Sequence, residues 1–170
     1  MFKRFTQSLV AWAFVHAPVV ARLWVRRHTP GTEPPFARLT IPLSSVTLGL
    51  VTTGGVHHRE QVPFRRKSES PVGDGTYRIL DLRRPREDFV ITHDWYDHRD
   101  AETDLNLVLP IERLSELSQE NVNRALYHVG VGLMGHVEGK EERGLQFETA
   151  PVVARLFQQE KVDAVLLVPA

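Results

Sequence analysis

The chain has 170 residues, of which 42% are hydrophobic and 25% are charged, the composition of one ordinary globular domain and not of a disordered or membrane-embedded protein. Basic and acidic residues balance at 21 each, so the net charge gives no reason to expect a nucleic acid partner. Cysteine is absent, which excludes disulfides, thiolate metal sites and a thiol nucleophile within these residues. We expect a cytoplasmic location, with which this composition is compatible.

The first thirty residues are basic and contain no acidic side chain. Their apolar run, residues 9–15, is too short to span a bilayer, and no small-residue cleavage site of a signal peptide follows it. Apolar residues recur at roughly helical spacing, at Phe5, Leu9, Trp12, Val19 and Leu23. We expect residues 1–30 to form a basic amphipathic helix, with a linker at 28–35, that packs or docks a partner. A helix resting on a membrane surface is the alternative, and no stable membrane insertion is expected.

Residues 36–170 alternate between strand-like and helix-like patterns. Strands are predicted at 46–52, 76–80, 89–92 and 163–168, and a long loop at 60–75. The segment 122–134 is short, apolar and contains glycine, which favours a strand followed by a loop. Helices are predicted after Pro110 and after Thr149, which is a plausible cap with Pro151 just inside the first turn.

This alternation predicts an α/β fold: a single domain with a mostly parallel sheet covered by helices and an N-terminal helical appendage. The strands that end at Thr52, Thr92 and Val168 are expected to lie side by side or nearly so. Their apolar character favours strands buried on both faces.

The densest polar cluster is the segment 92–100, directly after the strand that ends at Thr92. Three carboxylates and two imidazoles at a strand's carboxyl end suit metal binding or general acid–base chemistry. The plainer interpretation is a loop whose aspartates accept backbone N–H bonds. The candidate catalytic residues are His93, Asp97 and His98.

The same segment partly matches a known zinc signature. In the frame His-x-His-x-Asp-His of metallo-β-lactamases the chain has His93, Trp95, Asp97 and His98, and an indole cannot bind zinc. No metal site is therefore our main expectation. A metal-dependent hydrolase that uses His93, Asp97 and His98 stays open as an alternative.

Two further groups of residues are candidates. Gly54 and Gly55 precede His57 after the first strand, and with Asp94 and Asp100 they form the candidate substrate-binding set. A glycine pair alone is a weak phosphate-binding signal. A third, glycine-rich patch contains His128, Gly132, Met134, Gly135 and His136, where a histidine is more often a packing or surface residue.

Several sequence blocks occur together in a familiar order. They are Leu-Val-Thr-Thr-Gly-Gly-Val-His at 50–57, Gly-Asp-x-x-Tyr-Arg at 73–78, Thr-His-Asp-Trp-Tyr-Asp at 92–97, Asp-x-Asn at 104–106, Leu-Pro-Ile-Glu-Arg-Leu at 109–114, Met-Gly at 134–135, Glu-Thr-Ala-Pro at 148–151 and Val-Asp-Ala-Val-Leu-Leu-Val-Pro at 162–169. From about Phe36 to Ala170 the chain resembles the selenoprotein B family of glycine, sarcosine, betaine and D-proline reductases. The combination of blocks is specific, although no single block is.

The resemblance implies reductive cleavage of a carbon–nitrogen bond in a small amine or amino-acid-like substrate, with a dithiol as electron donor and other reductase subunits as partners. It also implies a redox selenocysteine or cysteine after the last strand, and the chain has no cysteine. We expect that a selenocysteine codon ended the reading of the gene. The alternative is a genuine short form that is not itself a reductase but a non-catalytic binding or assembly module.

Parallel strands bring the loops that follow them to one edge of a sheet, where α/β proteins bind ligands. We therefore expect His57, His93, Asp97 and His98 to converge at this edge, with Ala170 nearby. If these loops instead lie at opposite edges of the sheet, the histidines would be solvated surface groups.

Overall fold

The computed structural model describes residue 19 and residues 37–170. The predicted helix and linker in residues 1–30 lie outside the described residues, apart from Val19, and stay predictions. The chain divides into two compact units, Met1–Arg38 and Leu39–Ala170, and the second unit contains the sheet.

A four-stranded sheet forms the centre of this unit, in the order β3-β5-β1-β6. Its strands are β1 (Thr47–Thr52), β3 (Tyr77–Asp81), β5 (Ala125–Leu133) and β6 (Ala164–Val168). Both neighbours of β1 run parallel to it, and only β3 runs antiparallel, beside β5. The predicted α/β fold with a mostly parallel sheet is confirmed, and Thr52 lies directly opposite Val168.

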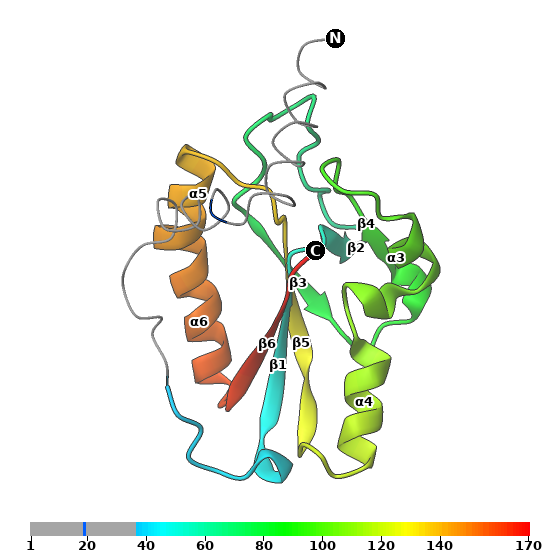
Figure 1. Cartoon of the computed structure of the whole chain (residues 1–170), viewed down its shortest axis with the longest axis vertical. Helices are drawn as coiled ribbons and strands as arrows, with labels where there is room; N and C mark the ends of the chain where they lie inside the picture. The colour runs from blue at the N-terminus through cyan, green and yellow to red at the C-terminus, as the bar shows by residue number, and fades with distance from the viewer. Residues whose placement is uncertain (1–18, 20–36) are drawn as a thin grey trace. The chain divides into compact units, whose positions relative to one another are not determined.

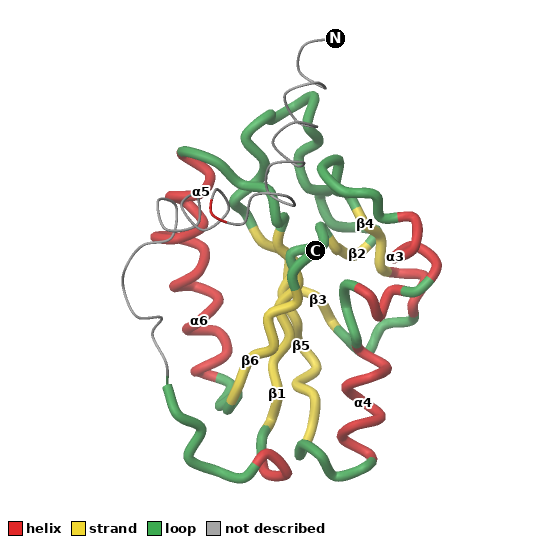
Figure 2. The backbone as a smooth tube through the Cα atoms, in the orientation of Figure 1, coloured by secondary structure: helices red, strands yellow, loops and turns green. Residues whose placement is uncertain are grey.

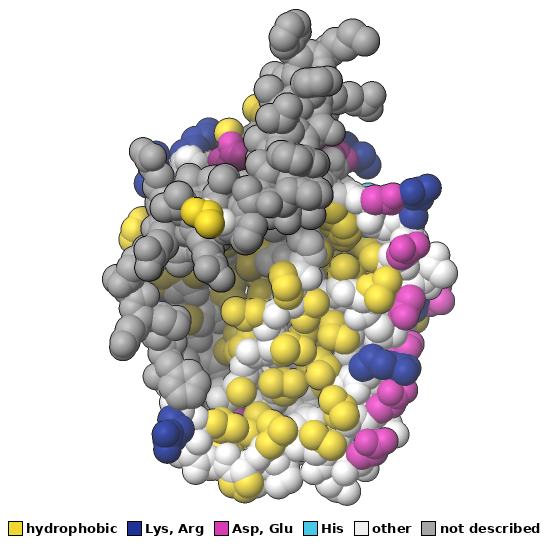
Figure 3. Space-filling model, in the orientation of Figure 1, with side chains coloured by type: hydrophobic (Ala, Val, Ile, Leu, Met, Phe, Trp, Pro, Cys, Tyr) yellow, Lys and Arg dark blue, Asp and Glu magenta, His cyan; other side chains and the backbone are white. Residues whose placement is uncertain are grey.

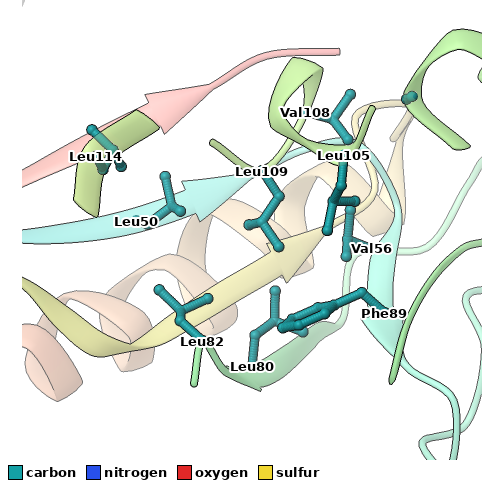
Figure 4. Packing of buried hydrophobic residues seen from close by; sticks show 10 residues of the cluster. Leu50, Val56, Leu80, Leu82, Phe89, Leu105, Val108, Leu109 and Leu114 are labelled. Carbon is teal, nitrogen blue, oxygen red and sulfur yellow. The ribbon is translucent and has the colours of Figure 1, made fainter. Parts of the chain in front are cut away.

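Helices cover both faces of the sheet (Figure 1). On one side lies α4 (Ile111–Gln119), and on the other lies α6 (Ala150–Gln159), which continues α5 (Lys140–Gly144). Leu50 of β1 faces the α4 side, where it packs with Leu114 and the residues drawn in Figure 4. Val51, the next residue, faces Val153 and Phe157 of α6. Successive residues of β1 therefore bury opposite faces, as its continuous apolar pattern predicts.

The remaining elements are short, and long loops connect them (Figure 2). A three-residue 3₁₀ turn, Leu43–Ser45, precedes β1, and the second, two-stranded sheet contains β2 (Val56–His58) and β4 (Phe89–Ile91). The turn Arg86–Asp88 leads into β4, and α3 (Arg99–Thr103) and the turn Leu105–Leu107 lead towards α4.

The strand before Thr92 does not belong to the main sheet, so the prediction that it lies beside the other two is wrong. Its three residues pair with β2 in antiparallel register, Val56 opposite Ile91 and His58 opposite Phe89. The chain turns at Gly54–Gly55 directly after β1 and leaves the sheet before β2 begins. Strands β2 and β4 therefore form a separate two-stranded sheet, which packs through Val56 and Phe89 on the side of the main sheet that α4 covers.

Two boundaries differ from the sequence prediction. Residues 125–133 form one continuous nine-residue strand, not a strand and a loop. The helical segment begins at Lys140, well before Thr149, and it passes through a π turn at Leu145–Thr149. Pro151 has no N–H to donate to the preceding turn, and a widened turn accommodates such a residue. The Thr149 hydroxyl donates to the Gly75 carbonyl oxygen (2.8 Å) and does not cap the helix.

Candidate functional site

The carboxyl ends of β1 and β6 meet at one edge of the sheet. The Thr53 N–H donates to the Val168 carbonyl oxygen, and the Ala170 N–H donates to the Thr53 hydroxyl oxygen, each at 3.0 Å. Residues 169 and 170 therefore lie beside the turn that follows β1.

The glycine pair brings the loop after Thr92 to this same edge. Gly55 has a positive φ of 69°, and a Cβ atom there would lie 2.5 Å from the Thr92 carbonyl oxygen and 3.0 Å from the Cβ of His93. Both glycine N–H groups are already donated, from Gly54 to the Thr52 hydroxyl oxygen and from Gly55 to the Leu133 carbonyl oxygen. The pair shapes the turn, and its amides are not free to bind a ligand.

His93 is buried at this edge, with 4% of its surface exposed. Its Nδ1 accepts a hydrogen bond from the Trp95 N–H (3.2 Å), so the neutral ring carries its proton on Nε2. Nε2 is buried and has no hydrogen-bond partner in the described part of the chain. Burial, reinforced by the neighbouring His98 and His136, lowers the pKa of His93 to about 4. At neutral pH this side chain is an uncharged hydrogen-bond donor.

Aromatic rings surround His93. The Tyr96 ring centre lies 4.6 Å from that of His93, and its hydroxyl donates to the Gly54 carbonyl oxygen (3.1 Å). Trp95 stacks on His136 with 4.6 Å between ring centres. Neither His136 nor Tyr96 was assigned a catalytic or substrate-binding role. His136 was named only in the third, glycine-rich patch, where a histidine was expected to be a packing or surface residue, and Tyr96 only in the block at 92–97.

His57 lies directly beneath the loop but has no free ring nitrogen. Its Nδ1 donates to the His58 carbonyl oxygen (2.8 Å), and its Nε2 accepts from the Thr92 hydroxyl (3.0 Å). Burial lowers the pKa of His57, which keeps it neutral. The residue ties β2 to the end of β4 and positions the start of the His93 loop.

The aspartates of the loop bind neighbouring groups of the chain. Asp94 accepts from the Lys67 N–H (2.9 Å) and contacts Arg66, while Asp97 is exposed and pairs with Arg99. That guanidinium holds the pKa of Asp97 at about 2. Asp100 is exposed in the first turn of α3.

His98 Nδ1 lies 2.9 Å from Glu102 Oε1 without hydrogen-bond alignment, and its ring centre lies 5.6 Å from that of Tyr96. Across residues 37–170 no three histidine, aspartate or glutamate side chains come together as metal ligands would. The geometry therefore gives no support to the alternative of a metal-dependent hydrolase.

A family model for glycine/sarcosine/betaine reductase selenoprotein B matches residues 34–170. The chain belongs to this family. D-proline reductase subunit gamma of Acetoanaerobium sticklandii is 33% identical to the chain over 150 residues, which cover 88% of this chain. The match spans 59% of the length of that relative. No solved structure matches the chain.

The Gly-Asp-x-x-Tyr-Arg block of this chain holds the long loop in place. The Asp74 carboxylate is buried and accepts hydrogen bonds from the N–H groups of Arg65 and Thr76 and from the Thr76 hydroxyl. Gly73 has a φ of 85°, and a Cβ there would lie 1.8 Å from the His136 carbonyl oxygen. The block thereby fixes the segment that carries His136 beside the His93 loop.

Proposed function

We propose that this chain is a subunit of a selenoprotein B-type reductase that cleaves a carbon–nitrogen bond of a small amine such as glycine, sarcosine, betaine or D-proline. In this reaction the C–N bond breaks and the carbon takes up two electrons and a proton, so that it gains a hydrogen. The nitrogen becomes an amine, which is released from glycine, sarcosine and betaine and stays attached in the ring-opened product of D-proline. A dithiol supplies the two electrons and becomes a disulfide. Membership of the selenoprotein B family and the name of the D-proline reductase relative support the proposal.

The observation that carries the proposal to particular residues is the buried, unpartnered Nε2–H of His93 at the carboxyl edge of the sheet. An uncharged donor in a buried position suits a carboxylate oxygen of the substrate, because a hydrogen bond to a charged acceptor is about twice as strong as a neutral one. His98, on the same loop, is the proposed group for delivering a proton. Asp97 is kept ionised at neutral pH by Arg99, so it is proposed to act there as a carboxylate and not as a proton donor.

The redox nucleophile in this proposal is a selenocysteine or a cysteine. Because the sequence has no cysteine, residues 1–170 do not supply it, and it must come from other polypeptide. Such a group would supply the low-pKa selenolate or thiolate that takes part in exchange with a dithiol. The edge formed by Thr53, Ala170 and His93 is the proposed place for it, next to the substrate that the His93 N–H is proposed to bind.

In the part of the chain that the structure describes, no helix is long and apolar enough to cross a membrane. The cytoplasmic location stays a prediction, as do the other reductase subunits as partners. The relative in Acetoanaerobium sticklandii is a subunit of a reductase, and this supports the proposal of a complex.

The test is to purify the protein from its own host together with whatever binds it. We expect it to reduce at least one of glycine, sarcosine, betaine and D-proline with dithiothreitol. His93→Leu removes the donor and is expected to raise KM for a carboxylate substrate about tenfold. His93→Gln keeps an N–H at a similar place, so its KM is expected to stay close to that of the wild type.

The second measurement is the nucleotide sequence of the gene after the Ala170 codon. A selenocysteine codon followed by an open frame would agree with the proposal. A folded, fully assembled protein that reduces none of the four substrates would exclude it and favour a non-catalytic assembly module.

A further inference from the structure

A cavity of about 250 Å³ lies between the segment that follows β3 and the segment that leads from α3 into α4. Its floor is apolar and consists of Leu82, Phe89, Leu105 and Leu109, each at most 6% exposed and all drawn in Figure 4. These four side chains belong to the hydrophobic core, so packing holds the floor in place. None of the residues that line the cavity belongs to the candidate site at the edge of the sheet.

The segment after β3 gives the cavity a basic side. The Arg86 guanidinium donates to the carbonyl oxygens of Phe89 (3.2 Å) and Glu102 (2.8 Å), which fixes it between this segment and α3. Among residues 37–170 no carboxylate pairs with Arg86, whereas Arg84, which also lines the cavity, already contacts two. A guanidinium has five N–H donors, so Arg86 keeps donors for an anionic group of a ligand.

The segment before α4 gives the cavity an acidic side. Asn106 Nδ2 donates to Asp104 Oδ1 and to Glu112 Oε2, each at 3.0 Å, and so holds the two carboxylates together. Hydrogen bonds from Asn106 also lower the pKa of Asp104, which keeps this carboxyl ionised at neutral pH. The other oxygen of each carboxylate accepts no hydrogen bond from the described residues. Figure 3, in the orientation of Figure 1, shows acidic and basic side chains together on the side of the molecule where α3 and α4 lie.

The size and the charges of the cavity limit what it can hold. Its volume lies just below the range of about 300–1,000 Å³ that is usual for ligand sites, so a nucleotide is too large. An anion would leave the acidic side unpaired, and a cation would leave the basic side unpaired. A small zwitterion with an apolar group matches both sides and the floor.

We propose that this cavity binds a free α-amino acid with an apolar side chain, whose carboxylate pairs with Arg86, whose ammonium group pairs with Asp104 and Glu112, and whose side chain covers the floor. A residue within a peptide does not carry both charges on one carbon, so a free amino acid fits and a peptide segment does not. Binding here is independent of the proposed function, because it involves neither His93 nor a redox nucleophile.

The test is isothermal titration calorimetry at pH 7 of the full chain, purified with whatever binds it, and the probes are L-leucine and L-valine. Two analogues of leucine each lack one charge: 4-methylpentanoate has no ammonium group, and 3-methylbutylamine has no carboxylate. We expect saturable binding of at least one amino acid. The two analogues should bind at least about tenfold more weakly than leucine, because each loses hydrogen bonds between charged groups. No binding of either amino acid up to about 10 mM, or an analogue that binds as tightly as leucine, would overturn the proposal.

Matched variants locate the bound amino acid. Glu112 and Glu116 are both exposed on α4 and both lie near Arg113, at 3.6 Å and 2.8 Å, but only Glu112 lines the cavity. Glu112→Gln is expected to weaken binding about tenfold, whereas Glu116→Gln leaves it unchanged. Equal affinities of these two variants would contradict the assignment.

The basic side is tested in the same way. Arg86→Gln should weaken binding about tenfold, and Arg83→Gln, whose side chain pairs with Asp81 and does not line the cavity, should not. If Arg86→Gln fails to fold after losing its two backbone hydrogen bonds, Glu112→Gln and the analogues still decide. Binding that is lost in His93→Leu but kept in Glu112→Gln would place the amino acid at the candidate site and would overturn the proposal. The titration requires no turnover, so a protein that reduces none of the four substrates can still show this binding.

Discussion

The Asp74 carboxylate is the clearest place to test how the loop before β3 is stabilised. Its side chain is 3% exposed. Burial raises the pKa of this group, but the hydrogen bonds from Thr76 and Arg65 outweigh it and lower the pKa from 3.8 to about 2. At about 1.4 kcal/mol for each pH unit, this fall corresponds to about 2 kcal/mol of folding stability at neutral pH.

Asp74→Asn keeps the size of the side chain but removes the charge. We expect it to lower the free energy of unfolding by about 2 kcal/mol at pH 7. Because the folded-state pKa is depressed, the carboxylate's contribution is complete above pH 3.8 and is lost as the pH falls through about 2. The difference between variant and wild type should therefore hold from pH 7 to pH 5 and shrink below about pH 4.

Urea denaturation followed by circular dichroism at several pH values measures this difference. Asp94→Asn is the matched control, since the Asp94 carboxylate also accepts a backbone N–H, from Lys67, but its side chain is 29% exposed. We expect the control to cost about 1 kcal/mol or less. A cost for Asp74→Asn that is no larger than the control, or that stays constant between pH 5 and pH 3, would refute the reasoning.

Three further measurements follow from the geometry. Gly73→Ala should destabilise the fold by about 3 kcal/mol in denaturant melts, because its Cβ would meet a carbonyl oxygen at 1.8 Å, whereas Gly139→Ala, at a φ of 58° with no atom within 4 Å, should cost about 1 kcal/mol. Nitrogen NMR should show His93 as the neutral Nε2–H form at pH 7, with a pKa of about 4, so that its contribution to stability falls as the pH drops from 6.5 towards 4. Tyr96→Phe removes the hydrogen bond to the Gly54 carbonyl oxygen and should cost about 1 kcal/mol; an unchanged melting temperature would contradict this role.

Much of the fold could be predicted because its strands carry a strong local signal. The run at 46–52 is mostly apolar and β-branched, the run at 164–168 is apolar, and the two pair as parallel neighbours with Thr52 opposite Val168. The strand at 89–92 could not be assigned to its sheet in the same way. Its pairing with β2 depends on the turn at Gly54–Gly55, which directs the chain out of the main sheet, and no periodic pattern reports that change of direction.

The candidate site was predictable in its location but not in its contacts. His93 does lie next to the turn after β1, but the rule that loops after parallel strands share an edge does not explain it, because the strand before His93 belongs to the second sheet. The close approach of Gly55 to Thr92 and His93 brings the loop there. Whether a histidine nitrogen is free depends on partners that are distant in sequence. His57 uses both nitrogens, one of them on Thr92, while His93 keeps one without a partner. The spacing of His57 and His93 in the sequence does not show which of the two keeps a ring nitrogen without a partner.

The pairing of β1 has a consequence for how the chain folds during synthesis. Both neighbours of this central strand come late in the sequence, since Thr47 lies opposite Ala125 and Leu48 lies opposite Ala164. The ribosome must therefore release more than a hundred further residues before the middle of the sheet is complete, and contacts of such long sequence separation slow folding. Until β5 is made, the apolar residues of β1 have no strand of the main sheet beside them, and its other side stays open until β6 is made. We expect the nascent chain to depend on chaperones in the interval, and its co-translational folding to be late and abrupt rather than gradual.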